Sequence, residues 1–325
     1  MAITLGKEML YLSRADVERC AITAKEMNAA IDAMFAAKAA GTAATKPKLA
    51  FFQPGGRSFR AKAGVMETPP YAAIKWFGYY AGNAARGVPD FLPLMIVNET
   101  ETGLPVCVMD GSWLSGMRTA SFSAVAAKHL ARKESASIGF VACGAQARMN
   151  LETLSAEFSI KRLVCYSRRA ETAERFAAEA RAKGFEAHVA RSPREAVEGQ
   201  DIVVTSVPHM AVGDLTLDAA WLSPGSYAAM VDLGYSWNAK SIEALDHVST
   251  DDHEQSAPGG PERLNYDKPY DSEISELVAG KKSGRRNASE RTALIFSGIG
   301  LGDVAAAALI YERAVAKGIG QVLAL

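Results

Sequence analysis

Residues 138–169 read IGFVACGAQARMNLETLSAEFSIKRLVCYSRR, and this stretch decides the fold. An apolar run at 138–141 ends in a turn of small residues, and a helical pattern then leads to a second apolar run at 163–166. Strand, turn, helix and strand in this order form the first unit of a dinucleotide-binding fold, in which small residues let backbone N–H groups approach a pyrophosphate at a helix N-terminus. The stretch therefore predicts a nucleotide-binding α/β domain.

The turn departs from the usual Gly-x-Gly-x-x-Gly/Ala pattern, since it reads Ala142-x-Gly144-x-x-Ala147. The second strand ends in Ser167-Arg168-Arg169, where an NAD site usually places a carboxylate that accepts hydrogen bonds from the ribose hydroxyls. A hydroxyl and two guanidinium groups suit a 2′-phosphate instead. The sequence therefore favours NADP(H) as the cofactor and leaves NAD(H) possible.

Composition sets broad limits on the class of protein. The 325 residues are enough for two domains, and the 36 basic and 36 acidic residues give no net charge that would favour nucleic acid or an anionic membrane as a partner. The four cysteines lack metal-ligand spacing, no metal site is expected, and a reducing compartment fits best. The N-terminus has no secretory signal pattern and no apolar run is long enough to span a bilayer, so we expect a cytoplasmic protein.

The chain before the nucleotide-binding stretch predicts a mixed or antiparallel sheet. A helical pattern covers 14–40, and a second one, rich in alanine, covers 118–132. Short strands are expected between these helices, at 48–52, 64–66, 71–80, 94–98 and 105–110.

Beyond residue 169 the pattern alternates between helix and strand, as in a parallel sheet with helices on both faces. Helices are expected at 171–183 and 193–198, and a short one near 274–278 within a polar loop region. Strands are expected at 186–190, 202–207, 227–233, 247–250 and 294–296. A last helix at 304–317 follows a glycine-rich segment.

Two positions in the first part of the chain indicate chemistry. Lys75 interrupts an apolar strand, and a buried lysine with a lowered pKa suits acid/base work or the binding of a substrate carboxylate. Its alternative is a solvent-facing lysine on an edge strand. Arg118-Thr119 is expected to begin the long helix, where a guanidinium, a hydroxyl and a helix N-terminus would bind an anion. Its alternative is a structural ion pair.

Several segments together resemble the ornithine cyclodeaminase/mu-crystallin family, over about residues 45–315. They are AAIKWFGYYAGNAARG (72–87), NETETGLPV (98–106), GSWLSGMRTASFSAVAAKHLAR (111–132), IGFVACGAQAR (138–148) and FSGIGLGDVAAAA (296–308). The ordered set that carries the resemblance is Lys75, Arg118-Thr119, Gly144-Ala145-Gln146 and Gly300-x-x-Asp303.

The resemblance implies a Rossmann-type dinucleotide-binding domain, at about 119–303, inserted in a mixed α+β substrate-binding and dimerisation domain formed by 1–118 and about 304–325. It also implies a homodimer and a small amino- or imino-acid substrate. Lys75 would contact the substrate, and Arg118 and Thr119 would contact both the cofactor and the substrate side of the nicotinamide. The remaining cofactor contacts implied are Gly144, Ala145, Gln146, Ser167, Arg168, Arg169, Thr205, Ser206, Val231, Asp232, Leu233 and Gly298, with Ile299 and Gly300 beside the substrate.

The chain departs from the cyclodeaminase pattern at three places. The aspartate that serves ring closure aligns with Gly234, and Asp232, two residues earlier on the same strand face, is the nearest replacement. The early-strand arginine that clamps the substrate carboxylate is matched by Lys48, with Arg57 or Arg60 as alternatives. The third departure is the basic segment 167–169, which differs from the acidic strand end of a cyclodeaminase that uses NAD.

These departures favour net hydride transfer over cyclodeamination. We expect an NADPH-dependent reductase of a small imino acid, such as a cyclic ketimine, with Lys75, Arg118 and Asp232 as the catalytic groups, acting where the two domains meet. The first alternative is a cyclodeaminase that retains NAD and releases ammonia from ornithine or a homologue. The second is a non-catalytic protein that holds NADPH and a ligand.

Overall fold

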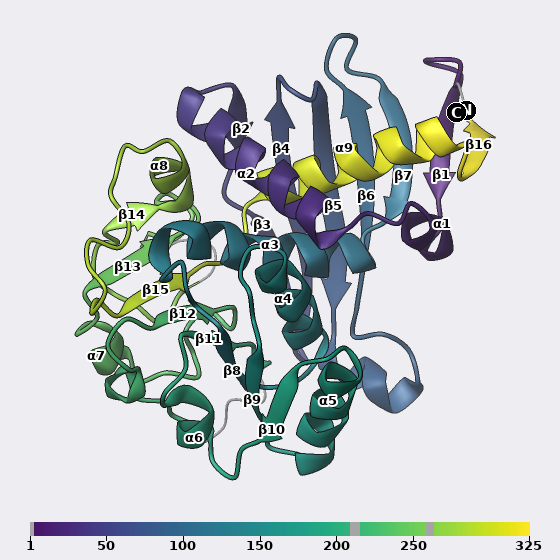
Figure 1. Cartoon of the computed structure of the whole chain (residues 1–325). Helices are drawn as coiled ribbons and strands as arrows, with labels where there is room; N and C mark the ends of the chain where they lie inside the picture. The colour runs from purple at the N-terminus through teal and green to yellow at the C-terminus, as the bar shows by residue number, and fades with distance from the viewer. Residues whose placement is uncertain (1–2, 209–214, 258–262) are drawn as a thin grey trace. The chain divides into compact units, whose positions relative to one another are not determined.

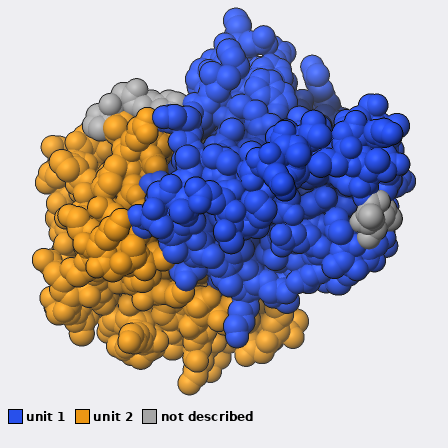
Figure 2. Space-filling view, turned by 90° about the horizontal axis from the view of Figure 1, so that it is seen from above, with its two compact units in different colours: residues 1–118, 298–325 blue, residues 119–297 orange. Residues whose placement is uncertain are grey.

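The computed structural model describes residues 3–208, 215–257 and 263–325. The chain folds into two compact units, which Figure 2 shows in separate colours. Unit 1 comprises residues 1–118 and 298–325, and unit 2 comprises residues 119–297. The chain thus returns to unit 1 at Gly298, whereas the family resemblance implies this return at about residue 304.

Unit 1 contains a mixed sheet in the order β16-β1-β7-β6-β5-β4-β2, with β3 paired to β4 (Figure 1). Its strands are β1 (Glu8–Leu12), β2 (Ala43–Thr45), β3 (Leu49–Gln53), β4 (Arg57–Met66), β5 (Tyr71–Tyr79), β6 (Phe91–Glu99), β7 (Pro105–Asp110) and β16 (Gln321–Ala324). β1 runs parallel to β7 and the other pairs are antiparallel, which confirms the mixed sheet expected for this part of the chain. The sequence did not predict β1, β2 or the edge strand β16.

Besides a short 3₁₀ helix at Ala81–Arg86, three α-helices lie wholly within the described residues of unit 1. They are α1 (Arg14–Arg19), α2 (Ala24–Ala40) and α9 (Gly300–Lys317), and α9 packs on β4, β5 and α2. The single helix expected over 14–40 is wrong, because the chain breaks at Ala21, which has a φ of 53°, and restarts at Thr23. Thr23 and Glu26 form a capping box, a pattern that fixes the start of a helix and is visible in the sequence.

Unit 2 contains a second sheet, in the order β10-β9-β8-β11-β12-β15-β13-β14, in which every described pair is parallel. Its strands are β8 (Ser137–Val141), β9 (Arg162–Tyr166), β10 (Glu186–Val189), β11 (Ile202–Thr205), β12 (Tyr227–Met230), β13 (His247–Thr250), β14 (Ser272–Glu273) and β15 (Thr292–Ile295). Every residue of β8, β11, β12 and β15 is buried, as central strands covered on both faces should be. The α/β fold class with a Rossmann-type domain is confirmed.

Five α-helices follow strands in the described part of unit 2, and all but the one at 239–242, which was not predicted, lie close to their expected places. They are α4 (Ala145–Ser155), α5 (Ala170–Ala182), α6 (Pro193–Val197), α7 (Ala239–Ile242) and α8 (Ile274–Val278). The strand expected over 227–233 ends earlier, at Met230, because the chain turns at Leu233, which adopts a φ of 61°.

The long helix α3 (Ser112–Leu130) begins earlier than the sequence pattern indicated. Asp110 accepts hydrogen bonds from the backbone N–H and the hydroxyl of Ser112, and Leu114 is already buried in the first turn. Arg118 and Thr119 therefore lie in the second turn. The expectation that they form a helix N-terminal anion site is wrong, since the partnerless N–H groups of a helix are confined to its first turn.

Candidate functional site

A cavity in unit 2 lies at the carboxyl ends of β8, β9 and β11 and has a volume of about 750 Å³. In a doubly wound sheet this end of the strands, at the point where strand order reverses, is where ligands bind. The lining residues are Val141, Ala142, Cys143, Gly144, Ala145, Gln146, Tyr166, Ser167, Arg168, Arg169, Thr172, Ser206, Val207, Pro208 and Leu215. This set contains seven of the predicted cofactor contacts: Gly144, Ala145, Gln146, Ser167, Arg168, Arg169 and Ser206.

The turn between β8 and α4 is shaped for close approach by a phosphate. Ala142 adopts a φ of 74°, which explains why a glycine is usual at this position. A Cβ on Gly144 would meet nothing within 4 Å, so the space in front of this residue is open. Gly144 is the N-cap of α4 and supplies no side-chain cap, so the N–H groups of the first turn remain available as donors. The turn therefore fits a dinucleotide pyrophosphate.

The basic end of β9 forms one side of this cavity. Ser167 Oγ accepts a hydrogen bond from the backbone N–H of Cys143, at 2.9 Å, and so ties the end of β9 to the phosphate turn. Arg168 and Arg169 are exposed and line the same cavity together with Thr172. Their guanidinium groups are therefore able to turn toward a ligand at the end of β9.

Asp232 lies in unit 2 inside a network of hydrogen bonds. Its carboxylate accepts bonds from Thr205 Oγ1 at 3.0 Å, from the Val207 N–H at 3.3 Å and from Ser236 Oγ at 2.6 Å. Burial raises the pKa of Asp232, and these hydrogen bonds act in the opposite direction. The network joins β11 to the turn after β12, so its visible effect is to hold that turn in place. Asp232, Thr205, Val231 and Leu233 do not line the cavity, and their catalytic or cofactor roles stay predictions.

A buried cluster of charges in unit 1 surrounds Lys75. Lys75 lies on the covered face of β5, and its Nζ donates a hydrogen bond to Asp303 Oδ1 at 2.6 Å. Arg118 Nε donates to the same oxygen at 2.9 Å. The three residues are at most 3% exposed. The alternative of a solvent-facing Lys75 is therefore wrong.

The segment before α9 closes one side of this cluster. Gly298 adopts a φ of 82°, and a Cβ there would collide with Arg118 Nη1. Ile299 is buried, and a Cβ on Gly300 would overlap the backbone of Ala63 in β4. Gly300 therefore brings the start of α9 close to the sheet, and this close packing places Asp303, in the first turn of α9, beside Lys75 and Arg118.

Two further lysines complete the cluster. Lys62, on β4, is directly opposite Lys75 in the strand register, and its Nζ donates to the Gly298 carbonyl at 2.7 Å. Lys48 precedes β3, is 5% exposed, and its charge acts on Lys62. Sequence reasoning missed Lys62 and gave Asp303 no role. The available signals were the alternation along 57–66, which puts Lys62 on the covered face, and the first-turn position of Asp303.

The charges of the cluster shift one another's titration. Burial and the charge of Arg118 lower the pKa of Lys75 to about 8, against the opposing effect of Asp303. Burial and the charges of Arg118 and Lys48 lower the pKa of Lys62 well below its ordinary value. Burial disfavours the ionised form of Asp303, but the surrounding cations outweigh it and lower the pKa of this carboxyl. The two lysines therefore hold their protons less tightly than ordinary lysines, and an anion bound beside them would favour their charged forms.

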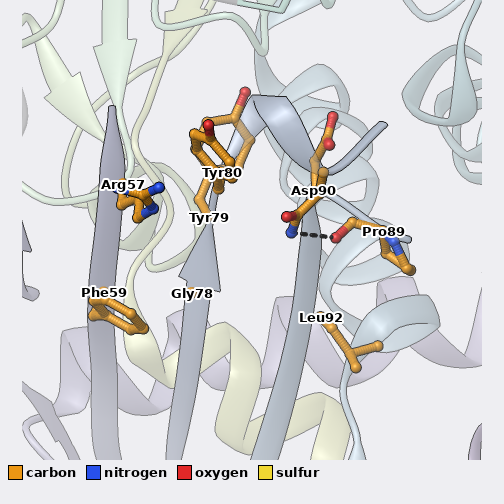
Figure 3. A pocket seen from close by; sticks show the side chains of 9 residues that line it. Arg57, Phe59, Gly78, Tyr79, Tyr80, Pro89, Asp90 and Leu92 are labelled. Atoms are coloured by element: carbon orange, nitrogen blue, oxygen red, sulfur yellow. Dashed lines mark hydrogen bonds between the residues drawn. The ribbon is translucent and has the colours of Figure 1, made fainter. Parts of the chain in front are cut away.

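The two arginines considered as alternatives to Lys48 lie elsewhere. Arg60 is partly buried on β4, with its guanidinium 5.7 Å from the centre of the Phe52 ring. Arg57 lies at the start of β4 and stacks over Tyr80 at 4.7 Å. Arg57 lines a separate hollow of about 240 Å³. Figure 3 shows it there with Phe59, Tyr79, Asp90 and Leu92. Neither arginine is among the charges that shift the pKa of Lys62, Lys75 or Asp303.

Metal sites and membrane spans are both absent from the described part of the chain. Within residues 3–208, 215–257 and 263–325, no group of three or more His, Cys, Asp or Glu side chains is arranged to hold a metal ion. No helix among these residues combines the length and apolar character that crossing a membrane requires.

The fold and the two sites define a dinucleotide-binding α/β protein with a buried cluster of lysines and an arginine. A model of the ornithine cyclodeaminase/mu-crystallin family matches residues 7–318. The chain belongs to this family, which confirms the resemblance seen in the sequence.

Comparisons with individual proteins agree with this assignment. Alanine dehydrogenase of Archaeoglobus fulgidus is 32% identical over 323 residues, which cover 97% of this chain and 98% of that protein. The structure of an archaeal alanine dehydrogenase dimer with bound NAD matches with a TM-score of 0.85 at 28% identity, covering 97% and 99% of the two chains. The Thermococcus litoralis Δ1-pyrroline-2-carboxylate reductase, solved with NADH and L-proline, matches with a TM-score of 0.86 at 26% identity, covering 96% and 99%.

Proposed function

We propose that this protein is an NAD(P)-dependent oxidoreductase that reduces the C=N bond of a small imino acid to an amine. The observation that carries the proposal is the buried cluster in which Lys75 and Arg118 share one oxygen of Asp303. The nucleotide cavity of unit 2 and the names of the alanine dehydrogenase and pyrroline-2-carboxylate reductase relatives support it.

The side chains of the cluster divide the work of such a reduction. A nicotinamide dinucleotide held by the turn after β8 and the end of β9 would supply hydride to such a reaction. The guanidinium of Arg118 binds the carboxylate of the imino acid. Lys75 Nζ donates a proton to the imine nitrogen, because a pKa of about 8 makes it a stronger acid than an ordinary lysine. Asp303 fixes both cations in position through Oδ1.

The same cluster disfavours the cyclodeaminase alternative. Ornithine carries a side-chain ammonium group in addition to its α-amino group, and the charge of Arg118, which already lowers the pKa of Lys75, disfavours a further cation beside it. The carboxylate of Asp232, the nearest replacement for the ring-closing aspartate, is occupied by Thr205, Val207 and Ser236.

A substrate panel tests the proposal directly. NADPH and NADH oxidation at 340 nm is measured with 1-pyrroline-2-carboxylate, 1-piperideine-2-carboxylate and 2-oxo acids plus ammonia. We expect oxidation with at least one of them. Ammonia release from ornithine without oxidation of either cofactor by any imine would contradict the reductase and support the cyclodeaminase.

We further propose that the preferred cofactor is NADPH, because the exposed Arg168 and Arg169 line the cavity at the end of β9. A charge-assisted hydrogen bond contributes about 1.5–3 kcal/mol. Arg168→Asp is therefore expected to lower kcat/KM for NADPH by about 10- to 100-fold and to affect NADH much less. Arg175→Asp is the matched control, since Arg175 is an exposed arginine of α5 outside the cavity lining. An unchanged NADPH/NADH ratio in Arg168→Asp would contradict this preference.

We also propose a homodimer that buries the outer face of the unit 1 sheet. Aligned register places apolar side chains on this face, and they are 37–58% exposed: Leu49, Phe51, Phe59, Val65, Trp76, Leu92, Leu94 and Ile96. Phe59 and Trp76 stack at 6.2 Å near its centre. A contiguous apolar patch of this kind marks a protein contact, and the archaeal alanine dehydrogenase is described as a dimer.

Trp76→Glu tests the dimer. A carboxylate buried without a partner in an interface costs roughly 3 kcal/mol or more, so we expect the dimer dissociation constant to rise by about 100-fold in sedimentation equilibrium. Leu5→Glu changes an equally exposed apolar residue away from this face and should leave the mass unchanged. If Trp76→Glu stays dimeric at the concentrations where the wild type does, the outer sheet face is not the interface.

A further inference from the structure

The guanidinium of Arg148, in the first turns of α4, is bonded to the chain through all three of its nitrogens. Nη1 donates to the carbonyls of Cys143 and Gly144, at 3.0 Å each. Nε and Nη2 donate to the two carboxylate oxygens of Glu179 on α5, at 2.6 and 2.7 Å. The guanidinium carbon also lies over the Phe176 ring, 5.4 Å from its centre. A planar fork held in this way has one fixed orientation.

The two carbonyls bound by Arg148 decide where the phosphate turn directs its N–H groups. In a trans peptide group the C=O and the N–H of the following residue point in opposite directions. With both carbonyls facing Arg148, the N–H groups of Gly144 and Ala145 point away from it. These two residues line the nucleotide cavity. Arg148 therefore holds the turn in the orientation that suits an anion in the cavity.

The backbone by itself holds this turn weakly. Gly144 is the N-cap of α4 and has no side chain to cap the helix. The first helical hydrogen bond, from the Arg148 N–H to the Gly144 carbonyl, is long at 3.5 Å, whereas the guanidinium reaches the same carbonyl at 3.0 Å. A glycine with open space in front of it also has access to other backbone conformations. The Arg148 side chain thus supplies an order that the backbone does not.

We propose that Arg148 is a positioning residue for the cofactor, which keeps the N–H donors of the phosphate turn directed at the pyrophosphate, and that Glu179 anchors it. This inference rests on the proposed function, since it requires that the cavity binds a nicotinamide dinucleotide. α5 begins directly after Arg169, so the ion pair links the phosphate turn to the helix that follows the basic end of β9. The hydrogen bonds from Arg148 lower the pKa of Glu179, which is therefore a carboxylate at neutral pH.

Cofactor binding is measured by titration calorimetry, without turnover. We expect Arg148→Met to raise the dissociation constants of NADPH and NADH by about 10- to 100-fold, as the loss of a charge-assisted hydrogen bond to the pyrophosphate does. The factor should be the same for both cofactors, because both contain the pyrophosphate. Arg148→Lys keeps the charge but loses the fork, and its affinities should lie between those of Arg148→Met and the wild type. Arg175→Met is the matched control, since Arg175 also acts on Glu179 but lies outside the cavity lining, and it should keep both affinities.

Glu179→Gln tests the anchor. It should weaken both cofactors in the same direction, by less than Arg148→Met does, and should have no further effect in the Arg148→Met background, because the two side chains act as one unit. In turnover, the KM for the cofactor should rise in Arg148→Met while kcat at saturating cofactor changes far less, because the phosphate turn takes no part in the chemical step.

The possible outcomes separate this inference from the proposed function. Unchanged affinities in Arg148→Met would overturn the positioning role, and so would a loss confined to NADPH, which would assign Arg148 to the 2′-phosphate. A full effect of Glu179→Gln in the Arg148→Met background would overturn the anchor. If Arg148→Met does not fold, Arg148→Lys and Glu179→Gln provide the same comparison. A wild type that binds neither cofactor would instead overturn the proposed function.

Discussion

Lys75→Met is expected to lower kcat/KM for imine reduction by about 10²- to 10⁴-fold, the range that a positioned acid contributes. Methionine keeps the length and flexibility of the lysine stem and removes only the charge and the proton. In the wild type, Lys75 is the proton donor in this scheme, so kcat/KM should fall as pH rises through about 8. The alkaline limb of this profile should disappear in the variant.

The same variant is expected to be at least as stable as the wild type. The folded protein lowers the pKa of Lys75 from 10.5 to about 8, so it holds the charged form at a net cost. Between about pH 8 and 10.5 the unfolded chain binds a proton at this position that the folded chain has lost, so this residue makes stability rise with pH in that window. Lys75→Met removes this dependence.

The measurements are a pH profile of kcat/KM and urea denaturation at pH 7 and pH 9.5. Lys46→Met, which removes an exposed lysine, serves as the control for loss of one lysine charge. An active Lys75→Met enzyme with an unchanged alkaline limb would remove Lys75 from the proton transfer. A variant that is inactive and also strongly destabilised would show instead that Lys75 acts as a structural partner of Asp303.

Local sequence patterns predicted most of the fold. The periodicity of 138–169 and the alternation after it predicted the parallel sheet, because buried central strands are continuous apolar runs bounded by turns. The predictions failed where an element depends on one helix-capping residue or on pairing between strands that are far apart in the sequence. The Thr23 capping box divides a pattern that looked continuous, and β1 is defined by pairing with β7 and β16, both far along the chain.

The two sites differ in how far sequence could describe them. The nucleotide cavity is built mainly from consecutive turns that follow strands, so a local motif located Gly144–Gln146 and Ser167–Arg169. The charge cluster is assembled from β4, β5, α3 and the start of α9, and no local pattern predicts that Lys62, Lys75, Arg118 and Asp303 share one buried volume. Asp303 was visible only as part of a motif, and its function follows from its partners.

Asp303→Asn is expected to have the opposite effect on stability from Lys75→Met. The folded protein lowers the pKa of Asp303 below its ordinary value of 3.8, so it favours the charged carboxylate. The stabilisation from this residue is present above about pH 3.8 and is lost as pH falls through the lower, folded pKa. At pH 7, removal of one partner from a buried ion pair costs about 3–5 kcal/mol. Because asparagine has nearly the same shape as aspartate, the loss of stability in this variant reports the effect of the charge.

A double-mutant cycle separates this charge effect from general disruption of α9. In Asp303→Asn the buried cations lose their counterion, and removal of one of them by Lys75→Met should restore part of the lost stability. Denaturation midpoints of the wild type, both single variants and the double variant at pH 7 give the coupling energy. We expect the double variant to be more stable than Asp303→Asn. If the two single effects simply add, Asp303 stabilises α9 through packing or helix geometry, and the cluster is not held together by its charge.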